Sequence, residues 1–206
     1  MVTEIRLYVE GGGNGKETRA RLREGFSSFL IALRNIAREK RIRWQIIPCG
    51  SRVSTFEDYQ IALRTHPSAF NVLLVDSDGP VTAPTRPLQY LQNQPGWTLR
   101  DIADEQCHLM VQIMESWLIA DIEALRRFYG QEFNANSIPR RHDIEQIEKR
   151  DVESSLRAAT RRTGKGEYHK IHHAPKILEQ LDVGRVRNVA QHCDRLFTIL
   201  TEKMNT

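Results

Sequence analysis

The sequence predicts an α/β fold: a mostly parallel sheet flanked by helices, followed by a helical C-terminal portion. Strand and helix patterns alternate over the first eighty residues, and such alternation is typical of parallel sheets joined by right-handed crossovers. The run FNVLLVD at 70–76 is almost continuously apolar, which suits a strand buried on both faces of such a sheet.

The first half of the chain predicts three strands separated by helices. Ile5, Leu7 and Val9 alternate with polar or amphipathic residues and predict a strand over 4–10. Helical spacing of apolar residues predicts one helix over 17–40, and RWQIIPC predicts a second strand over 43–49. Ser54 and Glu57 match a capping box that would open a helix ending near residue 65.

The second half predicts fewer strands and more helices. A proline-rich loop (80–87) and a short helix (88–93) precede an expected fourth strand over 108–114. An amphipathic helix over 115–130 follows, with Gly130 as its C-cap. Helices are then expected over 143–162, 174–181 and 184–204. A loop-like stretch at 131–140 divides the expected α/β core (1–130) from a helical extension packed on it (131–206).

Composition fits a globular protein of 206 residues with 27% charged residues. No apolar run approaches the ~18 residues of a membrane span, and no secretory signal opens the sequence. The three cysteines are odd in number and far apart, which favours a reducing, cytoplasmic setting. The net charge of +4 is compatible with nucleic-acid binding.

The stretch LYVEGGGNGKET resembles a nucleotide-binding P-loop but does not satisfy its spacing. Glu10 stands where the first glycine is required, and Glu17 replaces the hydroxyl residue that would hold Mg²⁺. A carboxylate at this place would also repel the phosphates. The glutamate before the glycines is therefore the feature to explain.

Three acidic residues stand at the ends of predicted strands: Glu10 ends the first, and Asp76 and Asp78 end the third. The carboxyl ends of parallel strands share one edge, where ligands of α/β sheets bind. Clustered carboxylates favour a hard cation such as Mg²⁺ or Mn²⁺. Gly11 and Gly12 would leave room for a bulky substrate beside the ion. The alternative is that these acids simply cap solvated strand ends.

Further residues are expected at the same edge. Glu115 opens a helix after the fourth predicted strand, so it is a candidate fourth carboxylate, although an acid there also suits the helix dipole. Lys16, Arg19 and Arg23 would hold phosphates near the acids.

The segment GKGEYHKIHH (164–173) is strongly basic and does not have the histidine spacing of a zinc helix. Lys170 is a candidate for stabilising a charged transition state, and His173 is a candidate substrate contact. The alternative is a solvated basic loop.

The motifs YVEGG and LLVDSDGP resemble the TOPRIM domain of topoisomerases, bacterial primases and overcoming-lysogenization-defect nucleases. The segments HLMVQIMESWLIAD and GEYHKIHHAPKILEQLD resemble a family of small bacterial TOPRIM-like proteins, often encoded beside AAA-type ATPases and associated with phage defence. The resemblance implies a TOPRIM-like, Rossmann-like sheet with Glu10, Asp76 and Asp78 as metal ligands. It also favours a functional Lys170 and implies an AAA-type ATPase partner.

These observations favour a Mg²⁺- or Mn²⁺-dependent endonuclease acting in phage defence. A non-catalytic regulatory or binding subunit of an ATPase complex is the alternative, and nucleotidyl or phosphoryl transfer is a third hypothesis. The sequence leaves open whether DNA or RNA is the substrate and whether the protein is a homodimer.

Overall fold

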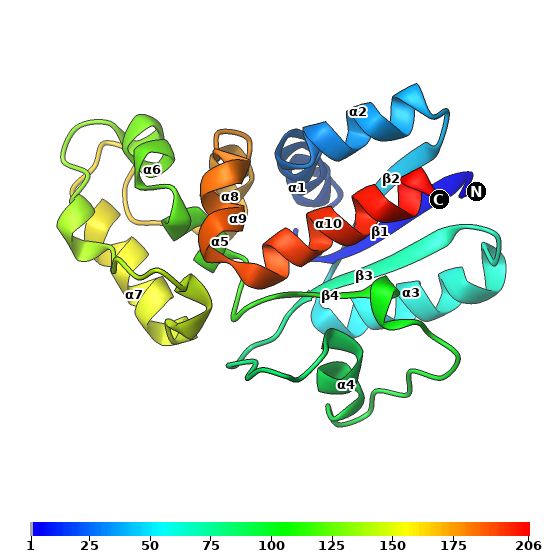
Figure 1. The fold of residues 1–206 in the computed structure, drawn as a ribbon. Helices are drawn as coiled ribbons and strands as arrows, with labels where there is room; N and C mark the ends of the chain where they lie inside the picture. Colours follow the sequence, from blue (N-terminus) through cyan, green and yellow to red (C-terminus); the bar gives the residue numbers. More distant parts are fainter. Residues whose placement is uncertain (1) are drawn as a thin grey trace.

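A computed structural model describes residues 2–206, with a sheet of four parallel strands in the order β2-β1-β3-β4 (Figure 1). The strands are β1 (Glu4–Glu10), β2 (Arg43–Gly50), β3 (Phe70–Asp76) and β4 (Cys107–Met110). Every residue of β3 is buried, as expected for a central strand covered on both faces. The predicted α/β class is confirmed.

Helices cover the sheet and make up nearly all of the regular structure after β4. The helices of the first half are α1 (Lys16–Phe29), α2 (Ile31–Glu39), α3 (Arg52–Thr65) and α4 (Pro87–Gln92). Those of the second half are α5 (Glu115–Ala120), α6 (Ile122–Tyr129), α7 (Lys149–Thr160), α8 (Lys170–Leu178), α9 (Val183–Val189) and α10 (Gln191–Asn205). Short 3₁₀ turns lie at Asp104–Gln106, Ala135–Ser137 and Ile144–Gln146.

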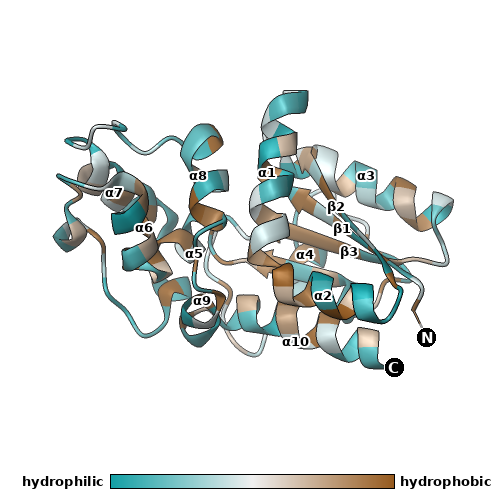
Figure 2. Ribbon diagram, turned by 90° about the horizontal axis from the view of Figure 1, so that it is seen from above, coloured by the Kyte–Doolittle hydropathy of each residue, from teal (hydrophilic) through white to brown (hydrophobic). Residues whose placement is uncertain are grey.

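The sheet separates two apolar cores because alternate side chains of each strand point to opposite faces. On one face, Leu7 and Leu74 pack in a core with Phe26 of α1, which continues into the C-terminal helices. On the other face, Leu73 packs in a core with Tyr59 of α3. Figure 2 shows the apolar strands between these helical layers.

The strand order places a topological switch point between β1 and β3. The chain leaves β1 through α1 and α2 to reach β2, and then returns through α3 past β1 to β3. Connections that diverge in this way open a crevice at the carboxyl ends of the two strands. Glu10 and Asp76 are the last residues of those strands, so the topology brings them together.

Two predictions in the first half were wrong in detail. The single helix expected over 17–40 is interrupted at Leu30, so that Phe29 in α1 and Leu33 in α2 are both buried. Neither proline nor glycine marks the break, so packing on the core is its only visible cause. The capping box at Ser54 does not start α3, because Ser51 is the N-cap and its side chain accepts from the Ser54 amide.

Predictions around the fourth strand also needed correction. The strand ends at Met110 instead of residue 114, and the helix expected over 115–130 is divided at Asp121. The buried Asp121 carboxylate caps α6 through the Ala124 amide and also accepts from the Asp182 amide. Gly130 is the C-cap, as predicted, with a positive φ of 71°.

The C-terminal helices differ from their predicted limits and return to the sheet. The helix expected over 143–162 begins only at Lys149, α8 begins at Lys170, four residues before its predicted start, and the last helix is divided at Ala190. Arg195 of α10 donates to the Cys107 carbonyl of β4 at 2.9 Å, which ties the end of the chain to the edge strand. Within residues 2–206, no helix has the length and apolar character needed to cross a membrane.

Candidate active site

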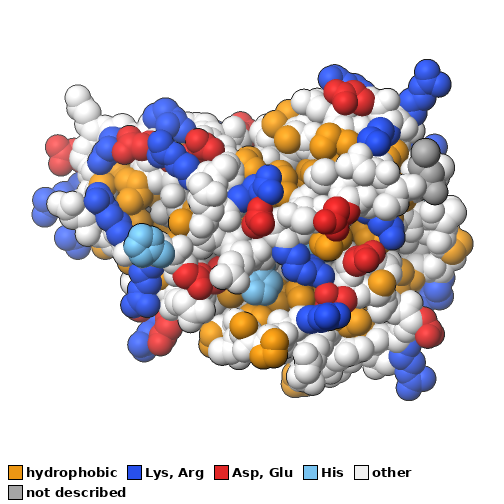
Figure 3. Space-filling model, in the orientation of Figure 1, with side chains coloured by type: hydrophobic (Ala, Val, Ile, Leu, Met, Phe, Trp, Pro, Cys, Tyr) orange, Lys and Arg blue, Asp and Glu red, His pale blue; other side chains and the backbone are white. Residues whose placement is uncertain are grey.

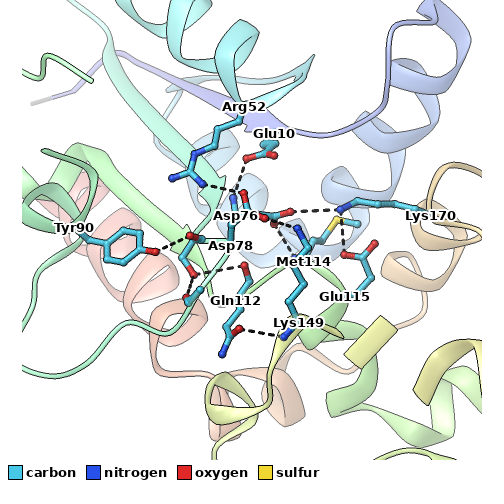
Figure 4. Close-up of polar contacts among 12 residues, drawn as sticks. Glu10, Arg52, Asp76, Asp78, Tyr90, Gln112, Met114, Glu115, Lys149 and Lys170 are labelled. Carbon is cyan, nitrogen blue, oxygen red and sulfur yellow. Dashed lines mark hydrogen bonds and ion pairs between the residues drawn. The ribbon is translucent and has the colours of Figure 1, made fainter. Parts of the chain in front are cut away.

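Glu10 and Asp76 meet at the carboxyl edge of the sheet (Figure 4). The Asp76 backbone amide donates to Glu10 Oε2 at 3.1 Å. Asp76 is buried, and its Oδ1 accepts from the Met114 amide at 2.8 Å. The chain after β4 therefore fixes the carboxylate that ends β3, while the Asp76 backbone fixes the carboxylate that ends β1.

Lys170, the first residue of α8, lies between two buried carboxylates. Its ammonium nitrogen is 3.4 Å from Asp76 Oδ2 and 3.3 Å from Glu115 Oε2. Glu115 is held on its other oxygen, because the Tyr168 hydroxyl donates to Oε1 at 2.9 Å. The Lys170 ammonium thus forms ion pairs with two acidic side chains from different elements. The Glu10 carboxylate is near enough for its charge to act on the same ammonium.

The negative charges that gather at this site shift the pKa values of its side chains. Burial, together with the neighbouring charges of Glu10 and Glu115, raises the pKa of Asp76 to about 8 in spite of the Lys170 ammonium. Burial also raises the pKa of Glu10, with the charge of Asp78 adding to the effect. Burial alone would lower the pKa of Lys170, but the charges of Asp76 and Glu115 outweigh it and raise that pKa.

Asp78 lies next to this cluster but is engaged elsewhere. β3 has ended, and Asp78 adopts a left-handed conformation with φ of 58°. Its carboxylate accepts from Arg52 of α3 at 3.0 Å and from Lys149 of α7. Burial raises its pKa, but the hydrogen bonds and charges of these two cations together lower it by more, so the net shift is downward. The structure therefore separates Asp78 from the group formed by Glu10, Asp76, Glu115 and Lys170.

A cavity of about 260 Å³ opens beside Glu10, Asp76 and Lys170. The glycine turn after β1 and the residue pair Gly50 and Ser51 form part of its wall. The remaining wall is largely apolar and consists of Leu22, Met114, Ile171 and Pro175. Gly11 and Gly12 therefore lie where the sequence predicted, at the edge of the site.

The glycine turn is held by backbone and side-chain hydrogen bonds. Gly11 and Gly50 exchange two backbone hydrogen bonds of 2.8 and 2.9 Å. Arg19 Nε donates to the Gly13 carbonyl at 3.0 Å. A Cβ atom at Gly11 would come within 2.9 Å of the Leu22 side chain, and φ at Gly11 is 120°, so only glycine fits this place without strain.

The other predicted phosphate and substrate contacts do not line the cavity. Lys16 is exposed at the start of α1, and Arg23 Nε donates to the Ile46 carbonyl. His173 Nδ1 accepts from the His169 amide at 3.2 Å and lies 3.0 Å from the Tyr129 hydroxyl. The side chains of Arg19, Arg23 and His173 therefore hold the backbone through hydrogen bonds. On the face drawn in Figure 3, basic side chains are spread over both ends of the molecule and interspersed with acidic ones.

Sequence reasoning missed Arg52, Lys149 and Tyr168. Arg52 could have been predicted, because it follows the carboxyl end of β2 and therefore lies near the same edge of the sheet. Tyr168 stands two residues before Lys170, but nothing local indicates that its hydroxyl meets Glu115. Lys149 carries no local signal, since only the docking of α7 brings it to Asp78.

Among residues 2–206, no three histidine, cysteine, aspartate or glutamate side chains form a ready-made metal cage. Mg²⁺ does not require one, because it is usually held by one or two carboxylates, waters and substrate phosphates. Glu10, Asp76 and Glu115 provide such oxygen donors, and the buried Glu115 Oε2 accepts no hydrogen bond, although the Lys170 ammonium lies 3.3 Å away. When all three carboxylates are ionised, they exceed the one ammonium by two negative charges, so the donor set fits a divalent cation.

Comparison with known proteins places the chain in a family. None of the curated proteins and none of the solved structures matches it. A family model matches residues 9–201, a span that includes the site residues from Glu10 to Lys170. The chain therefore belongs to the family described as a domain of unknown function, DUF4276.

Proposed function

We propose that this protein is a metal-dependent nuclease that hydrolyses phosphodiester bonds in DNA or RNA. The observation that carries the proposal is the cluster at the carboxyl edge of the sheet, where Lys170 pairs with Asp76 and Glu115 and the Asp76 amide donates to Glu10. This place is the binding edge of an open α/β sheet, and a cavity lies beside it. The resemblance of the motifs around Glu10 and Asp76 to TOPRIM domains supports the same activity.

Each residue has a role in this proposal. Glu10 and Asp76 would hold the cation, with Glu115 close enough to hold it or to orient its water shell. A bound Mg²⁺ or Mn²⁺ supplies Lewis acidity toward a phosphoryl oxygen and toward the attacking water. Lys170, which already neutralises two of the carboxylates, would stabilise the negative charge that develops on the phosphoryl oxygens.

The test is cleavage of plasmid DNA, single-stranded DNA and transfer RNA by the purified protein, with Mg²⁺ or Mn²⁺ and with EDTA. We expect cleavage that requires the metal and is lost in Asp76→Asn. This substitution keeps the acceptor for the Met114 amide and removes the charge. Asp194→Asn is the matched control, because Asp194 is half-exposed on α10, away from the site, and pairs with Arg187 of α9. Metal-independent cleavage, or full activity in Asp76→Asn, contradicts the proposal.

A nuclease that an ATPase partner switches on would not cut in this first assay. The assay is therefore repeated with an AAA-type ATPase encoded beside the protein and with ATP. Failure to cut any substrate under both conditions would favour the alternative of a non-catalytic regulatory subunit. Incorporation of labelled nucleotide, in place of its release, would favour nucleotidyl transfer.

A further inference from the structure

The cavity beside the carboxylates is lined by two chemically different sets of side chains. Glu10, Asp76 and Lys170 are its charged side chains. Leu22, Met114, Ile171 and Pro175 form the apolar part of its wall. A ligand that fills this cavity therefore joins a charged group, held near the carboxylates and the lysine, to a flat or compact apolar group.

Two helices that contribute to the wall of the cavity pack closely on each other. Gly25 of α1 faces α8 so closely that a Cβ atom there would come within 2.6 Å of the Pro175 carbonyl oxygen. A Cβ atom at Gly13 would lie 3.4 Å from the end of the Ile171 side chain, at van der Waals distance. Helices α1 and α8 therefore cannot approach each other further at Gly25.

The size of the cavity limits what can enter. Its volume of about 260 Å³ lies just below the roughly 300–1,000 Å³ of pockets for drug-sized ligands. One nucleoside fits a space of this size, whereas a base pair does not. A base in a stacked duplex cannot reach such a pocket unless it leaves the stack, and enzymes that bind flipped bases hold them between apolar or aromatic side chains.

We propose that this cavity binds the single unpaired nucleoside next to the phosphate that is cleaved, so that the substrate is a single strand, a loop or a frayed end. The base would lie between Leu22, Met114 and Ile171, and its phosphate would lie toward Lys170. The inference rests on the proposed nuclease function and adds the substrate class to it.

The first experiment compares cleavage of a single-stranded oligonucleotide with cleavage of the same sequence in a closed duplex. We expect the single strand to be cut about tenfold faster or more, as for a binding pocket that rejects one partner by shape. Ile171→Trp should fill the cavity and lower kcat/KM for the single strand by a similar factor. The matched control is Ile61→Trp, at a position on α3 that is 48% exposed, and its rate should equal that of the wild type. Equal rates on both substrates, or wild-type activity in Ile171→Trp, overturn the inference.

The second experiment measures binding without catalysis, so that it stays informative whatever the cleavage assay shows. Thymidine 5′-monophosphate is titrated into wild-type protein with Mg²⁺, and the methyl NMR signals of Leu22, Met114 and Ile171 are followed. Shifts of these signals that inorganic phosphate does not reproduce support the nucleoside pocket. No shifts, or equal shifts with phosphate, overturn it. Absence of metal-dependent cleavage would contradict the nuclease proposal. The titration would then show by itself whether the cavity binds a nucleotide.

Discussion

Asp76 and Asp78 are two residues apart, yet their carboxylates occupy opposite electrostatic environments. Asp76 is buried among other carboxylates that share one lysine, and its pKa is raised to about 8. Asp78 is 42% exposed, is held by both Arg52 and Lys149, and its pKa is lowered. Around Asp76 the carboxylates outnumber the cationic side chains, and a bound cation would balance their charge. The environment of Asp78 is already neutralised and links α3 to α7.

The comparison shows that an acid-x-acid motif does not by itself define a pair of equivalent ligands. The extended strand ends at Asp76, and the positive φ of Asp78 turns the next carboxylate toward α3 and α7. Backbone conformation after the strand therefore decides the role of the second aspartate. Three experiments test whether the two aspartates differ in this way.

The largest expected difference is in catalysis. Asp76→Asn should lower kcat/KM for nucleic-acid cleavage by on the order of 10²–10³-fold, because it removes a carboxylate charge that would hold the catalytic cation. Asp78→Asn should lower it by roughly tenfold or less, which is the effect of releasing the supporting residues Arg52 and Lys149. Circular dichroism spectra should show that both variants are folded. Equal losses in the two variants would show that Asp78 is a direct ligand and that the distinction fails.

The second difference is in stabilisation by metal. Ligand that binds only the folded state stabilises it by about 2.7 kcal/mol at one hundred times its Kd. Thermal unfolding with increasing Mg²⁺ should show a rise in Tm for the wild type and for Asp78→Asn. The rise should disappear in Asp76→Asn, which lacks the buried charge. Equal Mg²⁺-dependent shifts in both variants would remove Asp76 from the metal site.

The third difference is in the pH dependence of stability, measured by urea unfolding in EDTA. Because the folded pKa of Asp76 is about 8 and its unfolded pKa is about 3.9, the native state binds the extra proton between these values. Its contribution to stability is full below pH ~4 and is lost as the pH rises toward 8, by at most about 1.4 kcal/mol per unit.

Asp78 has the opposite sign. Its folded pKa is lowered, so its contribution is present above pH ~4 and is lost only in more acidic solution. Between pH 5 and 8 the downward slope of the wild type should therefore persist in Asp78→Asn and become clearly smaller in Asp76→Asn, where the raised pKa of Glu10 is still present. The same slope in all three proteins would contradict the environment described for Asp76.

Much of the site was predictable because it depends on chain order. Once β1 and β3 are identified as parallel strands, their carboxyl ends share an edge, so Glu10 and Asp76 must lie near each other. Glu115 was predictable for the same reason, since it follows β4. The role of Asp78 was not, because alternation along a strand says nothing about side chains beyond the point where the strand ends.

The alternation of strands and helices, the all-buried β3 and the acids at the carboxyl edge could be inferred from the amino-acid sequence, because they follow from local apolar periodicity and from the geometry of parallel sheets. Which cation meets which carboxylate depends instead on how the helices pack in three dimensions. Lys170 and Tyr168 reach Glu115 because α8 packs on α1 at Gly25, and Lys149 reaches Asp78 because α7 packs on α5. Such contacts join residues dozens of positions apart, and the packing of whole helices determines them.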